Sequence, residues 1–194
     1  FGTAATASTG TRNRGTSANT NYIYAPFGPP TGGGGPNDYY YGIANNTSAV
    51  NPPIITTTLA KPDANRVFSV WDITGDHTNA TNTARGNPPC DVTKPISATN
   101  PCGYMLVVNS AYNTDTVFQY LVSNLCTNTY YEISAWFKNM CYKCGQDSMG
   151  RGYWSGATYI PTGPNDSSGV KPNVAIAIDG VDYYTTGNLQ YQGL

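Results

Sequence analysis

The chain has 194 residues and a formal net charge of −1, and only 11% of its residues are charged. This fraction is far below the usual quarter, and the scarcity of Glu and Lys disfavours long helices. The sequence has no basic run that could attract nucleic acid and no apolar run near the roughly 20 residues of a membrane span.

The first part of the chain is poor in apolar periodicity. Residues 1–21 are rich in Gly, Thr, Asn and Ser, which predicts an extended arm or a loose first strand. A short strand is expected over residues 22–25, where proline ends it, and another over residues 38–45. We therefore divide the chain into an arm, residues 1–21, and a β domain, residues 22–194.

Two further strands follow in the middle of the chain. Residues 66–73 alternate between apolar and polar positions, which is typical of a half-buried strand. Residues 103–110 are nearly all apolar, which predicts a strand buried on both faces. The polar stretch between them is longer than the loops of compact domains usually are.

The most regular alternation lies in residues 115–126 and 129–144. Tyr131, Ile133 and Phe137 would face one side of a strand, and Trp136 and Lys138 the other. A cysteine lies near each end of the second segment. We predict that these two strands form the centre of a disulfide-stapled sandwich, with one face in the core.

The C-terminal part contains a second long loop, residues 145–172, and then a strand whose Val174, Ile176 and Ile178 share one face. Asp179-Gly180 is a hairpin turn signal. The sum is about seven or eight short strands, which favours an all-β fold, an antiparallel β-sandwich of jelly-roll type with long loops.

The chain contains an odd number of cysteines: Cys90, Cys102, Cys126, Cys141 and Cys144. In a chain of this composition they indicate disulfides in an oxidising compartment. We expect Cys90 to pair with Cys102, and Cys126 with Cys141 or Cys144. A zinc site at C-Y-K-C is the alternative, but a second pair of ligands is missing and His77 is the single histidine.

A set of motifs carries a family resemblance. In order they are W-D-I-T-G-D-H-T (71–78), G-Y-M-L-V-V-N-S (103–110), L-C-T-N-T-Y-Y-E-I-S-A-W-F-K-N (125–139), C-Y-K-C-G (141–145) and P-N-V-A-I-A-I-D-G (172–180). The chain resembles the jelly-roll domain near the N-terminus of large surface proteins of gliding bacteria, which the type IX secretion route exports. That domain is similar to the galactose- or carbohydrate-binding jelly rolls of secreted glycosidases. The resemblance implies export, a cell-surface location and a non-catalytic role.

The chain departs from the family's pattern in two respects. It lacks the W-x-x-x-x-F strand and the D-x-D-x-I closing strand that follow in similar domains, and Gln146 stands where a further cysteine is common. A closed sandwich needs strands that cover the edge left by residues 174–178. We therefore expect a longer parent protein, with another chain or the N-terminal arm as the alternative cover.

The sequence argues against an enzyme. A glycosidase uses two carboxyl groups, and Glu132 is the single glutamate, in the middle of a predicted strand, where a solvated outward position is expected. His77 lacks the G-x-S-x-G context of a hydrolase.

Glycan binding needs aromatic faces together with amide or carboxylate hydrogen-bond partners. The predicted ligand-binding residues gather in and beside the loop after Cys144, and they are Trp154, Tyr153, Tyr142, Asn139, Asp147 and Trp136. The alternative for Trp154 is a packing role at the end of the sandwich.

Two further kinds of site are weaker candidates. Asp72 and Asp76 offer carboxylates for one structural calcium ion, as related sandwiches bind, although both could cap turns instead. Thr116 and Ser148 stand in D-T-V and D-S-M triplets, which resemble the O-glycosylation signal of the same bacteria.

These observations predict a non-catalytic module for adhesion or glycan binding on the bacterial cell surface, part of a larger secreted protein. Its partners would be a glycan or a surface protein, neighbouring copies of itself or further domains of the parent chain, without nucleic acid or a membrane span. The alternative is a structural subunit of an extracellular filament or surface layer, assembled by strand exchange through residues 1–21.

Overall fold

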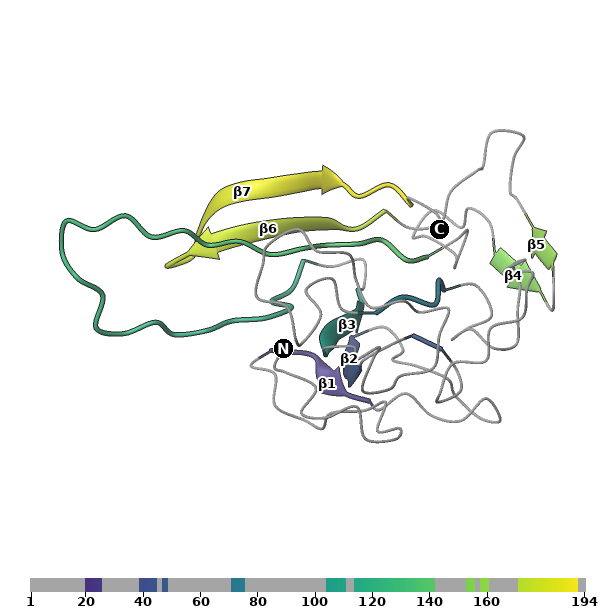
Figure 1. The fold of residues 1–194 in the computed structure, drawn as a ribbon. Coiled ribbons are helices and arrows are strands. Elements are labelled where there is room, and N and C mark those ends of the chain that lie inside the picture. The colour runs from purple at the N-terminus through teal and green to yellow at the C-terminus, as the bar shows by residue number, and fades with distance from the viewer. Residues whose placement is uncertain are drawn as a thin grey trace, which may run out of the picture.

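The described residues form strands and no helix (Figure 1). The structure, a computed structural model, describes residues 20–25, 39–44, 47–48, 71–75, 104–110, 114–141, 153–155, 158–160 and 171–191. Within these ranges, no helix exists that is long and apolar enough to cross a membrane. The expectation of an all-β chain without long helices therefore holds for the described residues.

The central sheet has three strands. β1 (Ile23–Tyr24) pairs in parallel with β2 (Tyr40–Ala44), which pairs antiparallel with β3 (Met105–Asn109). These strands confirm the predicted strands at 22–25, 38–45 and 103–110, with shorter bounds. The parallel pairing of β1 places the start of the described chain at one edge of this sheet.

Both faces of β3 carry an apolar cluster, as its nearly continuous apolar sequence predicts. On one face Val107 packs with Ala44 and Trp71. On the other, Leu106 and Val108 pack against a cluster made of Tyr22, Tyr41 and Ile43. Within β3 only Val107 is fully buried, so each cluster is small.

Two hairpins complete the strand inventory of the described chain. β6 (Asn173–Ile178) and β7 (Val181–Asn188) pair antiparallel through the predicted Asp179-Gly180 turn. Both turn residues have positive φ, 51° and 79°, which is the backbone that a two-residue hairpin turn requires. β4 (Tyr153–Ser155) and β5 (Thr158–Ile160) form a second hairpin.

Two sequence predictions are corrected by this architecture, and a third is described only in part. The region 145–172, predicted as a loop, contains the β4–β5 hairpin. The predicted strand at 66–73 is described only from Trp71, which makes an isolated antiparallel bridge to Cys141. Residues 115–138, predicted as the centre of the sandwich, lie outside every named strand.

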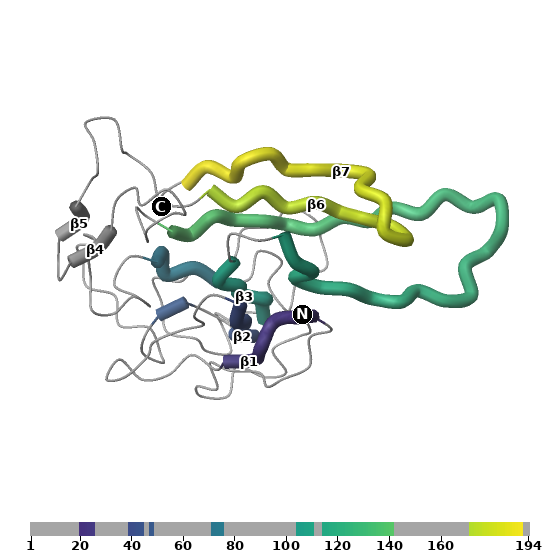
Figure 2. Tube along the Cα trace, turned by 180° about the vertical axis from the view of Figure 1, so that it is seen from behind, coloured from purple at the N-terminus to yellow at the C-terminus, as the bar shows by residue number. Residues whose placement is uncertain are grey.

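The correction at residues 115–138 affects the longest segment. Figures 1 and 2 show residues 114–141 as a long loop that leaves the body of the molecule and returns to it. Residues 118–138 are exposed throughout. The alternating pattern predicts a strand with one buried face, but residues 117–138 belong to no ladder in the described part of the chain, and the side chains from 118 to 138 are exposed at both alternating sets of positions.

The hairpin turn gives the first testable prediction. Gly180 has φ of 79° with open space around its Cα, so a Gly180→Ala side chain meets backbone strain and no clash. We expect Gly180→Ala to lower the opening free energy of β6–β7 by about 1–2 kcal/mol, measured by amide hydrogen exchange. Gly180→Asn is the matched control, because Asn tolerates positive φ, and it should keep most of the protection. Equal protection in the wild-type and Gly180→Ala chains would contradict the assignment of this turn.

Candidate binding surface

The segment 114–141, here called the protruding loop, is the feature most unlike a folded core. It consists of a first limb, residues 114–126, and a second limb, residues 130–141, joined by a turn at Thr127-Asn128. In Figures 1 and 2 the second limb runs along the β6–β7 hairpin, while the first limb starts close to the central sheet. The loop therefore extends from the central sheet past the turn of the hairpin (Figures 1 and 2).

The tip of the protruding loop is held by one tyrosine. The hydroxyl of Tyr131 accepts a hydrogen bond from the Cys126 amide at 2.6 Å and donates one to the Cys126 carbonyl at 3.3 Å. Asn124 and Asn128 have φ of 60° and 55°, and Asn tolerates this left-handed region better than most residues. The tip is thus a locally bonded turn.

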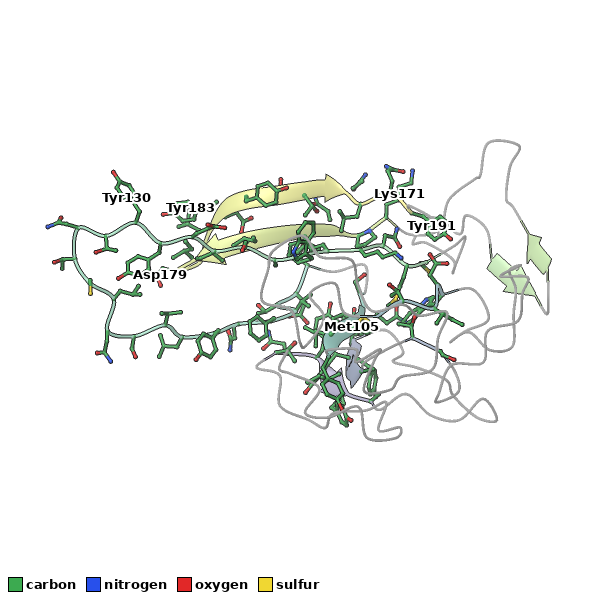
Figure 3. The ribbon with its side chains drawn as sticks, in the orientation of Figure 1. Met105, Tyr130, Lys171, Asp179, Tyr183 and Tyr191 are labelled. Atoms are coloured by element: carbon green, nitrogen blue, oxygen red, sulfur yellow. The ribbon has the colours of Figure 1, made fainter. Side chains whose placement is uncertain are left out.

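Large apolar side chains cover both limbs and remain exposed. On the first limb they are Phe118, Tyr120, Leu121, Val122 and Leu125, and on the second Tyr130, Tyr131, Ile133, Trp136 and Phe137. The β6–β7 hairpin adds Ile178, Val181, Tyr183 and Tyr184. Figure 3 shows Tyr130 and Tyr183 at the outer part of this region, far from Met105 in the central sheet.

These exposed side chains are the candidate interaction surface. Large contiguous apolar patches are rare on monomeric soluble proteins, and where they occur they mark contacts with proteins or other ligands. The exposed fractions are high: Leu121 is 86% exposed and Trp136 is 64% exposed. We call the exposed apolar residues of the second limb and the β6–β7 hairpin the aromatic surface.

The base of the second limb is fixed by backbone contacts. Cys141 forms an isolated antiparallel β-bridge with Trp71, and the Asp72 amide donates a hydrogen bond to the Met140 carbonyl at 2.8 Å. Asn139 forms a parallel bridge to Tyr191, and its side-chain amide donates to the Leu189 carbonyl at 3.0 Å. The second limb is therefore joined both to residues 71–72 and to the segment that follows β7.

A buried polar junction lies at the same place. Asp72 is fully buried, and its carboxylate Oδ1 accepts a hydrogen bond from the Tyr191 hydroxyl at 3.0 Å. The Thr47 hydroxyl, also fully buried, donates to the Asp72 carbonyl and accepts from the Thr74 amide at 2.8 Å. Because buried polar groups are costly without partners, these bonds fix the relative positions of the segments that supply them.

The structure separates the residues predicted to bind a glycan. Trp136 lies on the second limb with an exposed side chain. Tyr153 and Trp154 belong to β4, paired with Ile160 and Tyr159 of β5. Tyr142 and Asp147 lie outside the described residues.

Asn139 requires a correction. It is only 6% exposed, its Nδ2 donates to the Leu189 carbonyl, and its Oδ1 accepts from the Cys141 amide at 3.0 Å. Both ends of the amide are used inside the protein, so its role is to fix the base of the second limb rather than to bind a ligand.

The candidate calcium ligands do not form a described site. Asp72 is buried beside Tyr191, and Asp76 lies outside the described residues. In the part of the chain that the structure describes, no three His, Cys, Asp or Glu side chains come together. Calcium needs six to eight oxygen ligands, so one described carboxylate does not make up a coordination shell, and the calcium site stays a prediction.

The cysteines differ from the expected pairing. Cys126 is a free and exposed thiol, so the prediction that it pairs with Cys141 or Cys144 is wrong. Cys141 is disulfide-bonded, to a residue outside the described ranges. The reason is geometric, because Cys126 is at the tip and Cys141 at the base, and the extended second limb, residues 130–141, can span roughly 40 Å. Cys90, Cys102 and Cys144 lie outside the described residues.

The remaining residues singled out in the sequence are Thr116, Ser148 and Glu132. Thr116 is half-buried, and its carbonyl accepts hydrogen bonds from the Asn21 amide and the Thr20 hydroxyl. Its glycosylation stays a prediction, as does that of Ser148, which is not described. Glu132 is exposed on the second limb, like every residue from 118 to 138.

Comparison with known proteins identifies no relative of this chain. No protein-family model, no curated protein and no solved structure matches the chain.

The polar junction gives a stability prediction. Tyr191→Phe removes the hydroxyl that donates to the buried carboxylate of Asp72, and loss of a partner to a buried acceptor costs about 1–3 kcal/mol. We expect this loss in the free energy of unfolding measured in urea. Tyr183→Phe is the matched control, because Tyr183 is 70% exposed, and it should leave stability nearly unchanged. Equal effects of the two variants would contradict the role of the junction.

The cysteine assignment gives a chemical prediction. Iodoacetamide added to the native chain should alkylate Cys126, whereas Cys141 should become reactive only after reduction. Peptide mapping by mass spectrometry identifies the modified residue, and Cys126→Ser should abolish the native labelling at this position. Recovery of Cys126 in a disulfide-linked peptide would contradict the assignment.

Proposed function

We propose that the chain is a non-catalytic module for adhesion or glycan binding at the bacterial cell surface, part of a larger secreted protein. The observation that carries the proposal is the aromatic surface, where Tyr130 and Trp136 of the second limb and Tyr183 of β7 are exposed. Flat aromatic side chains that combine an apolar face with a polar tip are well suited to shallow recognition.

The disulfide supports the location outside the cell. Disulfides persist in oxidising compartments and are rare in reducing ones, and Cys141 is disulfide-bonded at the base of the second limb. The low charge and the abundance of Tyr, Asn, Thr and Ser agree with a secreted protein of the resembled type. The type IX secretion route enters the proposal only through that resemblance.

The binding mode would be noncovalent and shallow. Trp136 offers an indole face for a sugar ring, and Glu132 and Lys138 lie four residues before it and two residues after it in the chain. Charged side chains beside an aromatic platform can orient hydroxyl groups by hydrogen bonding. Trp136 is thus the residue of the predicted set on which the proposal depends most.

A second candidate function is a structural subunit of an extracellular filament or surface layer. The observation that favours it is the protruding loop, whose residues 117–138 share no ladder with other described residues. Extended segments without strand partners are templates for pairing with another chain. Assembly through residues 1–21, as the sequence suggests, concerns a segment of which only Thr20 and Asn21 are described.

The glycan proposal is tested by substitution of Trp136. A glycan array identifies a binding oligosaccharide, and calorimetry with it should show that Trp136→Ala weakens the dissociation constant by roughly tenfold or more, as loss of an aromatic anchor does. Leu121→Ala on the first limb is the control, because Leu121 is more exposed than Trp136 but aliphatic, and the affinity of this variant should stay near wild type. Absence of glycan binding in the wild-type chain would overturn the proposal, as would equal affinities of the two variants.

A further inference from the structure

We propose that the end of the protruding loop, residues 120–131, inserts into the surface of a lipid bilayer whose headgroups carry no net charge. We call these residues the outer loop. The proposal does not require that Trp136 binds a glycan, because Trp136 lies outside this segment, nearer the base of the second limb. It rests on the charge, the exposure, the position and the backbone hydrogen bonds of the outer loop.

The outer loop belongs to a stretch of the chain without charged side chains. Asp115 and Glu132 are the charged residues that precede and follow this stretch. Charged side chains are costly inside a bilayer, whereas apolar and aromatic side chains are favoured at its surface. The chain has a net charge of −1 and no basic run, so anionic headgroups would not attract it. The charge pattern therefore favours a neutral or zwitterionic surface.

Apolar side chains are exposed on both sides of the outer loop. Neighbouring residues of an extended chain point in opposite directions, and the consecutive Tyr120, Leu121 and Val122 are 75%, 86% and 55% exposed. On the other limb, the neighbours Tyr130 and Tyr131 are 104% and 51% exposed. A protein that docks along one face would cover one of the two sides, whereas lipid surrounds an inserted loop. This two-sided exposure therefore favours lipid over a protein partner.

The position of the outer loop lets it reach a planar surface. Figures 1 and 2 show the protruding loop passing the turn of the β6–β7 hairpin. In Figure 3, Tyr130 lies farther from the body of the molecule than Asp179, which belongs to that turn. A membrane that approaches this end of the molecule would therefore meet the side chains of the outer loop first.

Backbone hydrogen bonding limits the depth of insertion. An unpaired N–H or C=O group is costly in the hydrocarbon core, so irregular segments stay at its boundary. At the tip, the Tyr131 hydroxyl already bonds to both the amide and the carbonyl of Cys126, at 2.6 and 3.3 Å. The free thiol of Cys126 behaves as a small apolar group. We therefore place the tip at the boundary between headgroups and acyl chains, about 5–10 Å deep.

The expected binding is weak and reversible. Tyr120 and Tyr130 combine an apolar ring with a hydroxyl group, and such side chains are enriched at membrane–water interfaces. Leu121, Val122 and Leu125 together carry roughly as many aliphatic carbons as one myristoyl chain, which gives a partition constant on the order of 10⁴ M⁻¹. We expect a partition constant of this order or lower, which is measurable with vesicles at millimolar lipid.

Flotation of the full chain with phosphatidylcholine vesicles tests the proposal. The fraction of wild-type chain that floats should increase with the lipid concentration. Val122→Asp should weaken the partition constant by roughly tenfold or more, because a charge replaces an apolar side chain at the interface. Ile23→Asp is the matched control, since Ile23 is 56% exposed but lies in β1 of the central sheet, and this variant should float like the wild type.

The outcomes of flotation are distinct. A wild-type chain that does not float at millimolar lipid would overturn the proposal, as would equal losses in Val122→Asp and Ile23→Asp. Both substitutions are at exposed positions, so circular dichroism should show the wild-type fold for each variant. Trp136→Ala should keep vesicle binding. Loss of glycan binding with intact flotation therefore rejects the glycan proposal alone, and the reverse result rejects the membrane proposal alone.

Salt and lipid charge test the type of attraction. Partition driven by apolar side chains should persist when the salt concentration rises from about 0.1 M to about 1 M, whereas attraction between exposed charges is screened. Addition of anionic phosphatidylglycerol to the vesicles should not strengthen binding. Binding that vanishes at high salt, or that requires the anionic lipid, would contradict insertion of an uncharged loop.

The thiol at the tip reports the depth of insertion. An environment-sensitive fluorophore attached to Cys126 should shift its emission to shorter wavelengths when vesicles are added. A nitroxide near the headgroup end of the acyl chain should quench it more than one near the bilayer centre. The Cys126→Ser chain, treated in the same way, gives the background from other thiols. Unchanged emission at lipid concentrations where the wild-type chain floats would show that another part of the chain makes the contact.

Self-association is the outcome that would favour a protein partner. Sedimentation velocity of the full chain without lipid should show no oligomer that depends on the outer loop. An oligomer that forms in the wild-type chain and is lost in Val122→Asp would overturn the proposal, in favour of a second copy that covers these side chains.

Discussion

Asp72 holds together three parts of the described chain. Its amide donates to the Met140 carbonyl, its carbonyl accepts the Thr47 hydroxyl, and its carboxylate accepts the Tyr191 hydroxyl. Because the residue is fully buried, loss of these hydrogen bonds would leave buried polar groups without partners, which is costly. The protruding loop therefore returns to the body at a fixed point, beside the end of the β6–β7 hairpin, and its exposed limbs are presented by an anchored base.

Local patterns predicted the elements that local chemistry determines. Asp179-Gly180 implied a two-residue turn, and both residues have the required positive φ. The nearly continuous apolar sequence of β3 implied two covered faces, and each face carries a cluster. The β4–β5 hairpin was missed although Gly156-Ala157 is a Gly-X turn signal, because each of its strands has only three residues and is too short to show an alternating pattern.

The errors concern contacts between distant residues. Alternation shows that residues 115–138 can form a strand with distinct faces, but it contains no information on whether a partner strand covers them. Asn139 looked like a surface amide because its partners, Leu189 and Tyr191, lie far along the chain. Cys126 was paired by proximity in sequence, although an extended limb separates it from Cys141. Ten of the sixteen exposed large apolar residues in the described chain lie between Phe118 and Phe137, where this information was missing.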